Sequence, residues 1–275
     1  MTRGSFNNPN TTIHSTRRLQ LVHTDVCTMK PTSIAGFGYF ITFTDDFSRK
    51  SWVYPLRTKD ASFGTFLQWL REVEIETGEN LGALKPDGGG EYINGQFKSF
   101  LVEKGIKLEP SPAYTPQLNG VAERLNRTLN MRVRAMTTWA HLPLSFWAEA
   151  VKTACYIRNL SPSRLLDGQV PESKWSNQIP SVESLRVFGC LVFLRIRKRQ
   201  PKLQPKAFPC VFMGYEQQGR LYRVWDKSGR KFHVAAPQDL KFLEDIPGGD
   251  PFPANLPTGA ELFPAANDDE SGESD

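Results

Sequence analysis

Residues 111–127 constrain the fold of this chain most, because a turn-rich loop runs there directly into an amphipathic helix. The loop is rich in Ser, Pro, Thr, Asn and Gly, which favour turns and helix starts. From Gly120 onward the apolar residues recur at steps of three and four. This spacing predicts a single apolar stripe along a helix. The stripe consists of Ala122, Leu125, Leu129, Val133 and Met136.

Glu123 lies off this stripe, on the polar side of the predicted helix together with Asn126, Arg127 and Asn130. A carboxylate in that position can be a solvated surface group. It can also be held over a site that other segments complete. The choice between the two depends on other acids in the chain.

Two aspartates favour the second alternative. Asp25 lies in an apolar, β-prone run, LQLVHTDV, and Asp87 ends a short apolar run that three glycines follow. Glycines after a strand allow a backbone to approach a ligand closely. Asp87 and Glu123 are separated by 35 residues, enough for a helix, a strand and the entry loop. Two strand acids and one helix acid can therefore converge in an α/β fold. Three hard oxygen ligands without a companion His or Cys suit Mg²⁺ or Mn²⁺ rather than zinc.

The motifs HTDV, PDGGGEY and AYTPQLNGVAERLNRTL resemble the integrase core of copia-type retrotransposons. That core belongs to the RNase H-like polynucleotidyl transferases, which carry two aspartates and then a glutamate 35 residues after the second, the spacing found here. Further matches are YFITFTDDFSRKSWVYPLRTKD, LPLSFWAEAV and LRVFGC, so that the resemblance covers roughly residues 18–243.

The resemblance implies an RNase H-like α/β fold, a mixed five-stranded sheet flanked by helices, followed by a small all-β, barrel-like module. It implies a catalytic and metal-binding triad of Asp25, Asp87 and Glu123 that holds two Mg²⁺ or Mn²⁺ ions, with Asp25 bridging both. The implied reaction trims the 3′ end of element DNA and joins it to target DNA. The implied partners are these two DNAs and further copies of the chain. The implied locations are the nucleus and a cytoplasmic virus-like particle.

The charge of the chain is unevenly distributed. Residues 244–275 hold nine acids and no Lys or Arg, which leaves 34 basic and 20 acidic residues in 1–243, a formal net charge of +14. A body this basic indicates a polyanionic partner. Charge alone does not distinguish DNA from RNA, ribosomes or acidic membranes.

The cysteines favour neither disulfides nor a metal finger. Cys27, Cys155, Cys190 and Cys210 form no CxxC pair, and no pair of histidines lies near them. We therefore expect four buried or half-buried free thiols, a reducing compartment and no zinc. No apolar run has the length of a membrane span, so no membrane partner is expected.

The coarse pattern predicts a core at 18–178, after a polar, disordered remnant at 1–17 that lacks the zinc-binding segment of full-length family members. The predicted strands cover 19–26, 37–44, 51–56, 81–85 and 106–108, and the predicted helices cover 59–77, 94–104 and 144–160, with a short amphipathic piece at 171–175. Short β runs split by turns predict the all-β module at 185–243. Residues 244–275 are expected to form an acidic, disordered tail.

Several polar residues are candidates for contacts to DNA. The basic connection at 195–206 can be a solvated hairpin or a clamp on phosphates. His23, two residues before Asp25, either touches the site or packs beside it. The candidate DNA contacts are Tyr114, Gln117, Asn119, Arg124, Arg127, Arg195, Arg197, Lys198, Arg199 and Lys202.

Departures from the family pattern leave two alternatives to an active integrase. Pro86 and Gly88 stand where the family usually has Ser and Asn, and Thr28-Met29 replaces Gly-Pro. Proline removes a backbone donor at the strand end, and glycine removes a side-chain amide beside the metal site. One alternative is a decayed or repurposed nucleic-acid-binding fragment of a Gag-Pol polyprotein. The other is an ordinary RNase H-like nuclease.

Overall fold

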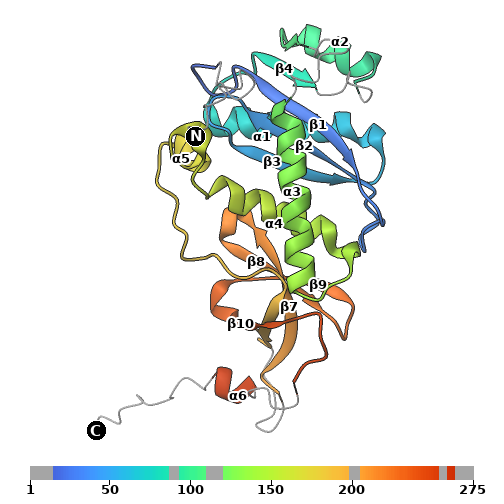
Figure 1. The fold of residues 1–275 in the computed structure, drawn as a ribbon, viewed down its shortest axis with the longest axis vertical. Helices are drawn as coiled ribbons and strands as arrows, with labels where there is room; N and C mark the ends of the chain where they lie inside the picture. The colour runs from blue at the N-terminus through green and yellow to red at the C-terminus, as the bar shows by residue number, and fades with distance from the viewer. Residues whose placement is uncertain (1–14, 87–92, 110–119, 198–204, 254–258, 264–275) are drawn as a thin grey trace, which may run out of the picture. The chain divides into compact units, whose positions relative to one another are not determined.

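The computed structural model describes residues 15–86, 93–109, 120–197, 205–253 and 259–263 (Figure 1). The chain divides into two compact units, the first made of residues 1–135 and 144–185 and the second of residues 136–143 and 186–275. The division falls inside helix α3 (Gly120–Trp139), whose last residues therefore belong to the second unit.

The first unit contains a mixed five-stranded sheet in the order β3-β2-β1-β4-β5. The first three strands pair antiparallel, as expected of consecutive hairpins, whereas β4 pairs parallel with both β1 and β5. This is the RNase H-like arrangement expected from the sequence. The strands are β1 (Val22–Thr28), β2 (Tyr39–Asp45), β3 (Ser51–Leu56), β4 (Ala83–Pro86) and β5 (Lys107–Leu108).

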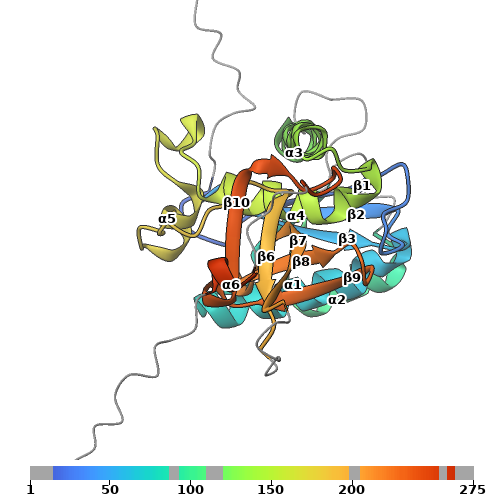
Figure 2. The ribbon, with the colours of Figure 1, turned by 90° about the horizontal axis from the view of Figure 1, so that it is seen from below.

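Helices lie on both faces of this sheet, α1 (Ser62–Thr77) and α2 (Gly95–Glu103) on one and α3 and α4 (Trp147–Asn159) on the other (Figure 2). The alternation along β2 produces this division, since successive strand residues point to opposite faces. Phe43 stacks on Trp69 of α1 with ring centroids 4.3 Å apart. Phe40 on the opposite face lies 6.2 Å from Trp147 of α4. The face opposite α1 also carries Thr42, which stands opposite Asp25 of β1 in the strand register.

The helix ends follow local rules. Helix α1 stops at Gly78, whose φ of 68° is the left-handed conformation that glycine adopts without strain. Helix α2 begins after Asn94, whose side-chain oxygen accepts a hydrogen bond from the backbone N–H of Phe97. The predicted helix at 144–160 is a 3₁₀ turn at Leu144–Phe146 followed by α4.

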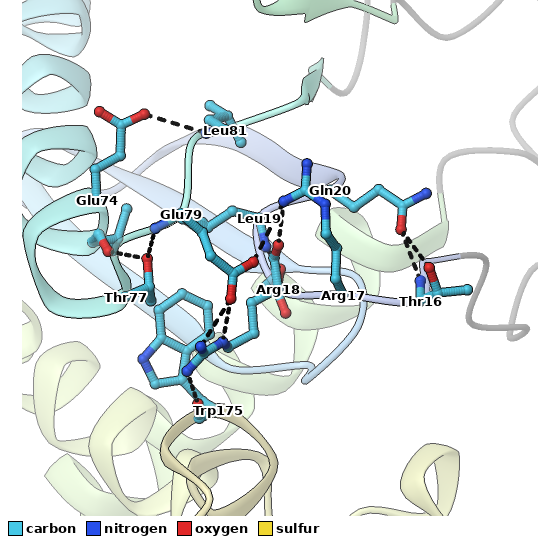
Figure 3. Close-up of polar contacts among 12 residues, drawn as sticks. Thr16, Arg17, Arg18, Leu19, Gln20, Glu74, Thr77, Glu79, Leu81 and Trp175 are labelled. Atoms are coloured by element: carbon cyan, nitrogen blue, oxygen red, sulfur yellow. Dashed lines mark hydrogen bonds and ion pairs between the residues drawn. The ribbon is translucent and has the colours of Figure 1, made fainter.

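The prediction of disorder up to residue 17 is wrong for residues 15–17, while residues 1–14 lie outside the described part. Ser15 is buried, and its backbone N–H donates to Asp46 Oδ2 at 2.9 Å. Figure 3 shows Arg18 donating both to Glu79 Oε1, 2.8 Å from Nη2, and to the carbonyl of Trp175. A polar composition suggested disorder, but these polar groups find fixed partners in distant segments.

The short amphipathic piece predicted near 171–175 is confirmed as α5 (Pro171–Ser176). Trp175 anchors it and is only 1% exposed. Its indole lies against Trp52 of β3, with ring centroids 4.9 Å apart, and donates to Glu76 of α1 at 2.9 Å. Lys50 closes the cluster, with its Nζ 5.2 Å from the Trp175 ring and 3.0 Å from Glu172.

The second unit is the predicted all-β module, a five-stranded antiparallel sheet in the order β10-β6-β7-β8-β9. One face carries an apolar cluster that includes Val192, Cys210, Phe212 and Tyr222. The strands are β6 (Cys190–Arg195), β7 (Ala207–Glu216), β8 (Leu221–Asp226), β9 (Lys231–Ala235) and β10 (Leu240–Pro247).

The predicted disordered tail from residue 244 is wrong for residues 244–253 and 259–263. Strand β10 continues to Pro247, and a short helix, α6, covers Gly259–Leu262. Phe252 and Phe263 pack on the outer face of β6, against Leu191 and Phe193. Acids and prolines dominate the composition of this segment, which is why the sequence predicted disorder. The few apolar residues that hold the segment in place, such as Phe252 and Phe263, are too sparse to change that composition.

The end of α3 joins the second unit through specific contacts that the predicted boundaries at 178 and 185 do not include. The backbone N–H of Gly249 donates to the carbonyl of Ala140 at 2.9 Å. The neighbouring His141 pairs with Asp250 at 2.7 Å.

All four cysteines are free thiols, as predicted, with Cys27 partly buried and the other three buried. Burial raises the pKa of Cys155, Cys190 and Cys210 to about 12, so these thiols stay protonated. Within the described ranges, no helix combines the length and the apolar character that crossing a membrane requires.

Candidate catalytic site

Strand β1 places three chemically active side chains on one face. His23, Asp25 and Cys27 alternate with residues that include Val22 and Val26, and these two valines belong to the core against α1. The alternation turns the three active side chains toward the opposite face, which α3 covers. Asp25 stands opposite Thr42 in the β1–β2 register, on the same face.

Asp25 is joined to helix α3 by a direct hydrogen bond. Asn126 Nδ2 donates to Asp25 Oδ2 at 2.6 Å, while the other carboxylate oxygen accepts the backbone N–H of Val26 at 2.8 Å. The Thr42 hydroxyl donates to Asn126 Oδ1 at 3.4 Å. Asn126 is buried, as is Thr42. The threonine thus holds the amide in the orientation that presents its NH₂ group to Asp25.

Glu123 lies one helical turn before Asn126, on the same side of α3, because residues three apart are neighbours on a helix surface. Its side chain is exposed, as its position off the apolar stripe predicted. The predicted stripe itself is confirmed at Ala122, Leu125, Leu129 and Val133, all buried.

A second contact between β1 and α3 lies one turn further along the helix. Asn130 Nδ2 lies 3.8 Å from Cys27 Sγ. The spacing of Asn126 and Asn130 along the helix therefore matches the spacing of Asp25 and Cys27 along the strand. Four residues of a helix and two residues of a strand cover similar distances. Burial raises the pKa of Cys27, and the nearby carboxylate of Asp25 raises it further. Cys27 is therefore a protonated thiol and a weak metal ligand.

His23 belongs to a separate buried network. Its Nε2 lies 3.2 Å from Asp46 Oδ1, and the same oxygen accepts from Arg49 Nη2 at 3.0 Å. Burial lowers the pKa of His23, and the hydrogen bond to Asp46 together with its negative charge offsets only part of this shift. Of the two alternatives for His23, packing beside the site is the one its contacts support.

Asp87 lies outside the described residues, so its position relative to Asp25 and Glu123 stays a prediction. Strand β4 is described up to Pro86, which pairs with Thr24, the residue before Asp25. Pro86 therefore does not interrupt the pairing of β4 with β1. Gly88 lies in the segment that is not described.

The candidate DNA contacts fall into three groups. Tyr114, Gln117, Asn119, Lys198, Arg199 and Lys202 lie outside the described residues. Arg127 is exposed on α3, whereas the guanidinium of Arg124 folds over Gly120, where an added Cβ would lie 2.2 Å from Nη1. Arg195 and Arg197 are exposed in the second unit, and Arg197 pairs with Asp239.

The described surroundings of Asp25 fit a hard divalent cation. A carboxylate offers hard oxygen donors, and the bonds from Val26 and Asn126 orient the two oxygens of Asp25. The nearby soft donors are engaged or protonated, since His23 pairs with Asp46 and Cys27 keeps its proton. The described residues contain no group of three or more His, Cys, Asp or Glu side chains that could hold a metal, and Asp87 is not among those residues.

Sequence reasoning assigned no role to Asn126 or Thr42. Asn126 belongs to the polar face of the helix and lies three residues after Glu123, a spacing that could have marked it. Thr42 carries no comparable signal. Its importance comes from the antiparallel register that sets it opposite Asp25.

Two family models match this chain. The integrase core domain matches residues 15–116, and the retroviral polymerase SH3-like domain matches residues 190–252. The first match covers Asp25 and Asp87 and ends before Glu123. The second coincides with the antiparallel sheet of the second unit.

Curated relatives are retrotransposon polyproteins. A retrovirus-related Pol polyprotein from transposon TNT 1-94 of Nicotiana tabacum is 46% identical over 228 residues, which is 82% of this chain and 17% of the relative. One from transposon RE2 of Arabidopsis thaliana is 31% identical over 277 residues, 93% of this chain and 19% of the relative. The chain thus spans less than a fifth of the length of these relatives.

A solved structure, described as a simian T-cell lymphotropic virus intasome in complex with PP2A regulatory subunit B56 gamma, contains a chain that is 14% identical. The alignment covers 81% of this chain and 78% of that chain with a TM-score of 0.47, a likeness too low to bear on the site. The chain belongs to the integrase core domain family, with a retroviral SH3-like domain after the core, and its relatives are the Pol polyproteins of copia-type retrotransposons.

Proposed function

We propose that this chain is the catalytic region of a retrotransposon integrase, which processes the 3′ ends of element DNA and joins them to target DNA. The observation that carries the proposal is the 2.6 Å hydrogen bond from Asn126 to Asp25. It brings the helix of Glu123 against the strand of Asp25, two segments about 100 residues apart in the sequence. We take this placement of the helix as support for a role of Glu123 beside Asp25, rather than as a solvated surface group.

The third acid is proposed from the strand register. Asp87 follows Pro86, and Pro86 pairs with Thr24 beside Asp25. Covalent geometry keeps the Cα of Asp87 about 3.8 Å from that of Pro86. Asp25, Asp87 and Glu123 are therefore the residues that, in this proposal, would hold two Mg²⁺ or Mn²⁺ ions. When bound, such ions activate the attacking oxygen and neutralise the leaving oxygen of an in-line phosphoryl displacement.

The protein's own contribution is to hold these carboxylates in place. Asn126 restrains one oxygen of Asp25, and Thr42 restrains the amide of Asn126. Ligands that are already oriented need no reorganisation when the reaction begins. The exposed Arg127, one turn after Glu123, is suited to a DNA phosphate beside the reacting strand.

A strand-transfer assay with labelled element-end DNA and a target duplex tests this function. We expect joined products with Mg²⁺ or Mn²⁺, no products after chelation, and none from Glu123→Gln. Glu103→Gln, at an exposed position on α2, serves as the matched control and should keep full activity. Hydrolysis of an RNA–DNA hybrid without any strand joining would instead identify a nuclease.

A second candidate is a decayed copy that binds nucleic acid without catalysis, and the Pro86 and Gly88 departures favour it. DNA binding without joining, under both metals, would select this candidate. For the integrase the nucleus is the proposed place of action, because chromosomal DNA is the proposed target. The family's cytoplasmic particle is the proposed earlier location. Copies of the chain acting together on paired DNA ends are also part of the proposal.

A further inference from the structure

Strand β4 carries a lysine on the same face of the sheet as Asp25. In the parallel pairing of β1 with β4, Lys85 stands beside His23. The preceding pair, Val22 and Leu84, belongs to the core against α1, so the next residue of each strand points to the opposite face. Lys85 therefore lies on the face that α3 covers. No sequence motif singles it out.

Lys85 is also close to Asp25 along this face. His23 and Asp25 are two residues apart on β1, about 6.7 Å, and neighbouring strands lie about 4.8 Å apart. The Cα of Lys85 is therefore about 8 Å from the Cα of Asp25. In the sequence, Lys85 precedes Asp87 by two residues. A phosphate next to one that is held at these carboxylates is within reach of the lysine ammonium.

The surroundings of Lys85 leave its ammonium open to an anion. Lys85 is half-buried, whereas Leu84 and Pro86 on either side of it are buried. Within residues 15–86, 93–109 and 120–197, no carboxylate forms an ion pair with this lysine, and this includes the exposed Glu109 that follows the neighbouring strand β5. A lysine in such a place packs its stem on the protein and keeps its charge at the surface.

The charged groups around His23 have a positive balance. Burial is the main cause of the low pKa of His23, and the cations Arg49 and Lys85 lower it further. Arg124 of α3 acts on Arg49 in the same way. The acids that act on Arg49 are Asp45 and Asp46. Three cations against two carboxylates leave a net charge of +1 in this group, which favours an anionic ligand.

We propose that Lys85 binds a backbone phosphate of the DNA strand whose reacting phosphate lies at Asp25 and Glu123. The inference rests on the proposed function and adds a contact that fixes the position of the strand. Lysine binds phosphate as a compact point charge, and a half-buried stem limits where that charge can go. The contact positions the strand without reading its sequence, because phosphates carry no sequence information.

Paired changes in the protein and in the DNA test this contact. The proteins are the native chain, Lys85→Met, which keeps the stem and removes the charge, and Lys85→Arg, which keeps the charge. Each is titrated with fluorescent element-end duplexes in which one phosphate near the 3′ end is replaced by an uncharged methylphosphonate. Affinities are measured with Ca²⁺, which takes oxygen ligands as Mg²⁺ does, and strand joining is measured with Mg²⁺ on the same duplexes.

We expect Lys85→Met to bind the unmodified duplex about threefold to tenfold more weakly and to lower the slope of log affinity against log salt by about 0.9. Lys85→Arg should stay within about threefold of the native affinity. One methylphosphonate, next to the reacting phosphate, should weaken binding by the native protein and leave binding by Lys85→Met unchanged. Lys98→Met is the matched control, because Lys98 is exposed on α2 at the opposite side of the sheet. It should keep the native sensitivity to that phosphate.

Equal affinity of the native and Lys85→Met proteins for the unmodified duplex would overturn the inference. So would losses from Lys85→Met and from each methylphosphonate that simply multiply at every position, because a structural role favours no single phosphate. If Lys85→Met melts well below the native protein, the native and Lys85→Arg proteins decide. A scan of these two that finds no sensitive phosphate beside the reacting one would then overturn the inference.

The outcomes also separate this inference from the proposed function. Coupling between Lys85 and one phosphate, without any strand joining, would contradict the integrase activity and leave the inference standing. Joining by all the proteins without such coupling would do the reverse. Failure of the native chain to bind DNA would remove both the inference and the DNA-binding part of the function.

Discussion

The side-chain amide of Asn126 donates to the carboxylate of Asp25 at 2.6 Å and so joins helix α3 to strand β1. Both residues lie on the face of the sheet opposite α1, and the contact repeats one turn later between Asn130 and Cys27. Because Glu123 precedes Asn126 by one turn, the position of this glutamate depends on the same hydrogen bond.

Replacing Asn126 with Ala is expected to lower the rate of strand transfer about 10- to 100-fold. A hydrogen bond to a charged group contributes about 1.5–3 kcal/mol, and its loss lets the Asp25 carboxylate leave its orientation. The Mg²⁺ concentration for half-maximal rate should rise as well, which a purely structural role would not require. Asn130→Ala, which loses only the contact to Cys27, is the control and should show neither change.

Asp87→Asn should abolish strand transfer and leave DNA affinity within about twofold of the native value. The substitution removes a carboxylate proposed to hold a cation, while the basic surface that supplies affinity stays intact. Gel-based joining assays and anisotropy titrations on the same preparation measure both quantities. Joining at the native rate would remove Asp87 from the proposed triad.

The pair Pro86→Ser and Gly88→Asn tests whether this copy has decayed. If the missing backbone donor and side-chain amide limit catalysis, the repaired protein should join DNA at least about tenfold faster than the native one, the value of a single catalytic hydrogen bond of about 1.4 kcal/mol. Pro86 already pairs with Thr24, so the repair should change the melting temperature little. Equal joining rates would show that both departures are harmless and would end the argument for decay.

Replacing Arg197, Lys198 and Arg199 with Ala is expected to flatten the dependence of log affinity on log salt. Three phosphate contacts would account for a slope change of about 2.7. We expect about 1.8, because Arg197 already pairs with Asp239. Lys98, Lys104 and Lys107, exposed in the first unit, give a matched triple replacement that should leave the slope nearer its native value. An unchanged slope in the first variant would identify the connection as a solvated hairpin.

Trp175→Ala is expected to lower the free energy of unfolding of the first unit by about 3–5 kcal/mol. The indole is buried between Trp52 and the Lys50 ammonium, so truncation leaves a cavity and removes the hydrogen bond to Glu76. Urea unfolding followed by far-UV circular dichroism measures the change. Ile75→Ala, on the same unit and 78% exposed, should change stability by less than about 0.5 kcal/mol.

The sequence alone determined most of the first unit. Apolar periodicity predicted the helix of Glu123, and four of the five stripe residues are buried, while Met136 is half-buried. Alternation in β-prone runs and the stop at Gly78 predicted strands and helix ends to within a few residues. These features depend on neighbours in the chain, so a local pattern is enough to reveal them.

Only the tertiary structure decided which distant side chains meet. The orientation of Asn126 depends on Thr42, and Thr42 faces Asp25 only through the pairing of β1 with β2. In the same way, Phe263 reaches the base of the β6–β7 hairpin although its surroundings in the sequence are acidic and rich in proline. Composition averages over a segment, whereas one buried aromatic ring can hold that segment in place. Contacts of this kind depend on strand register and on packing between distant residues, which no local pattern contains.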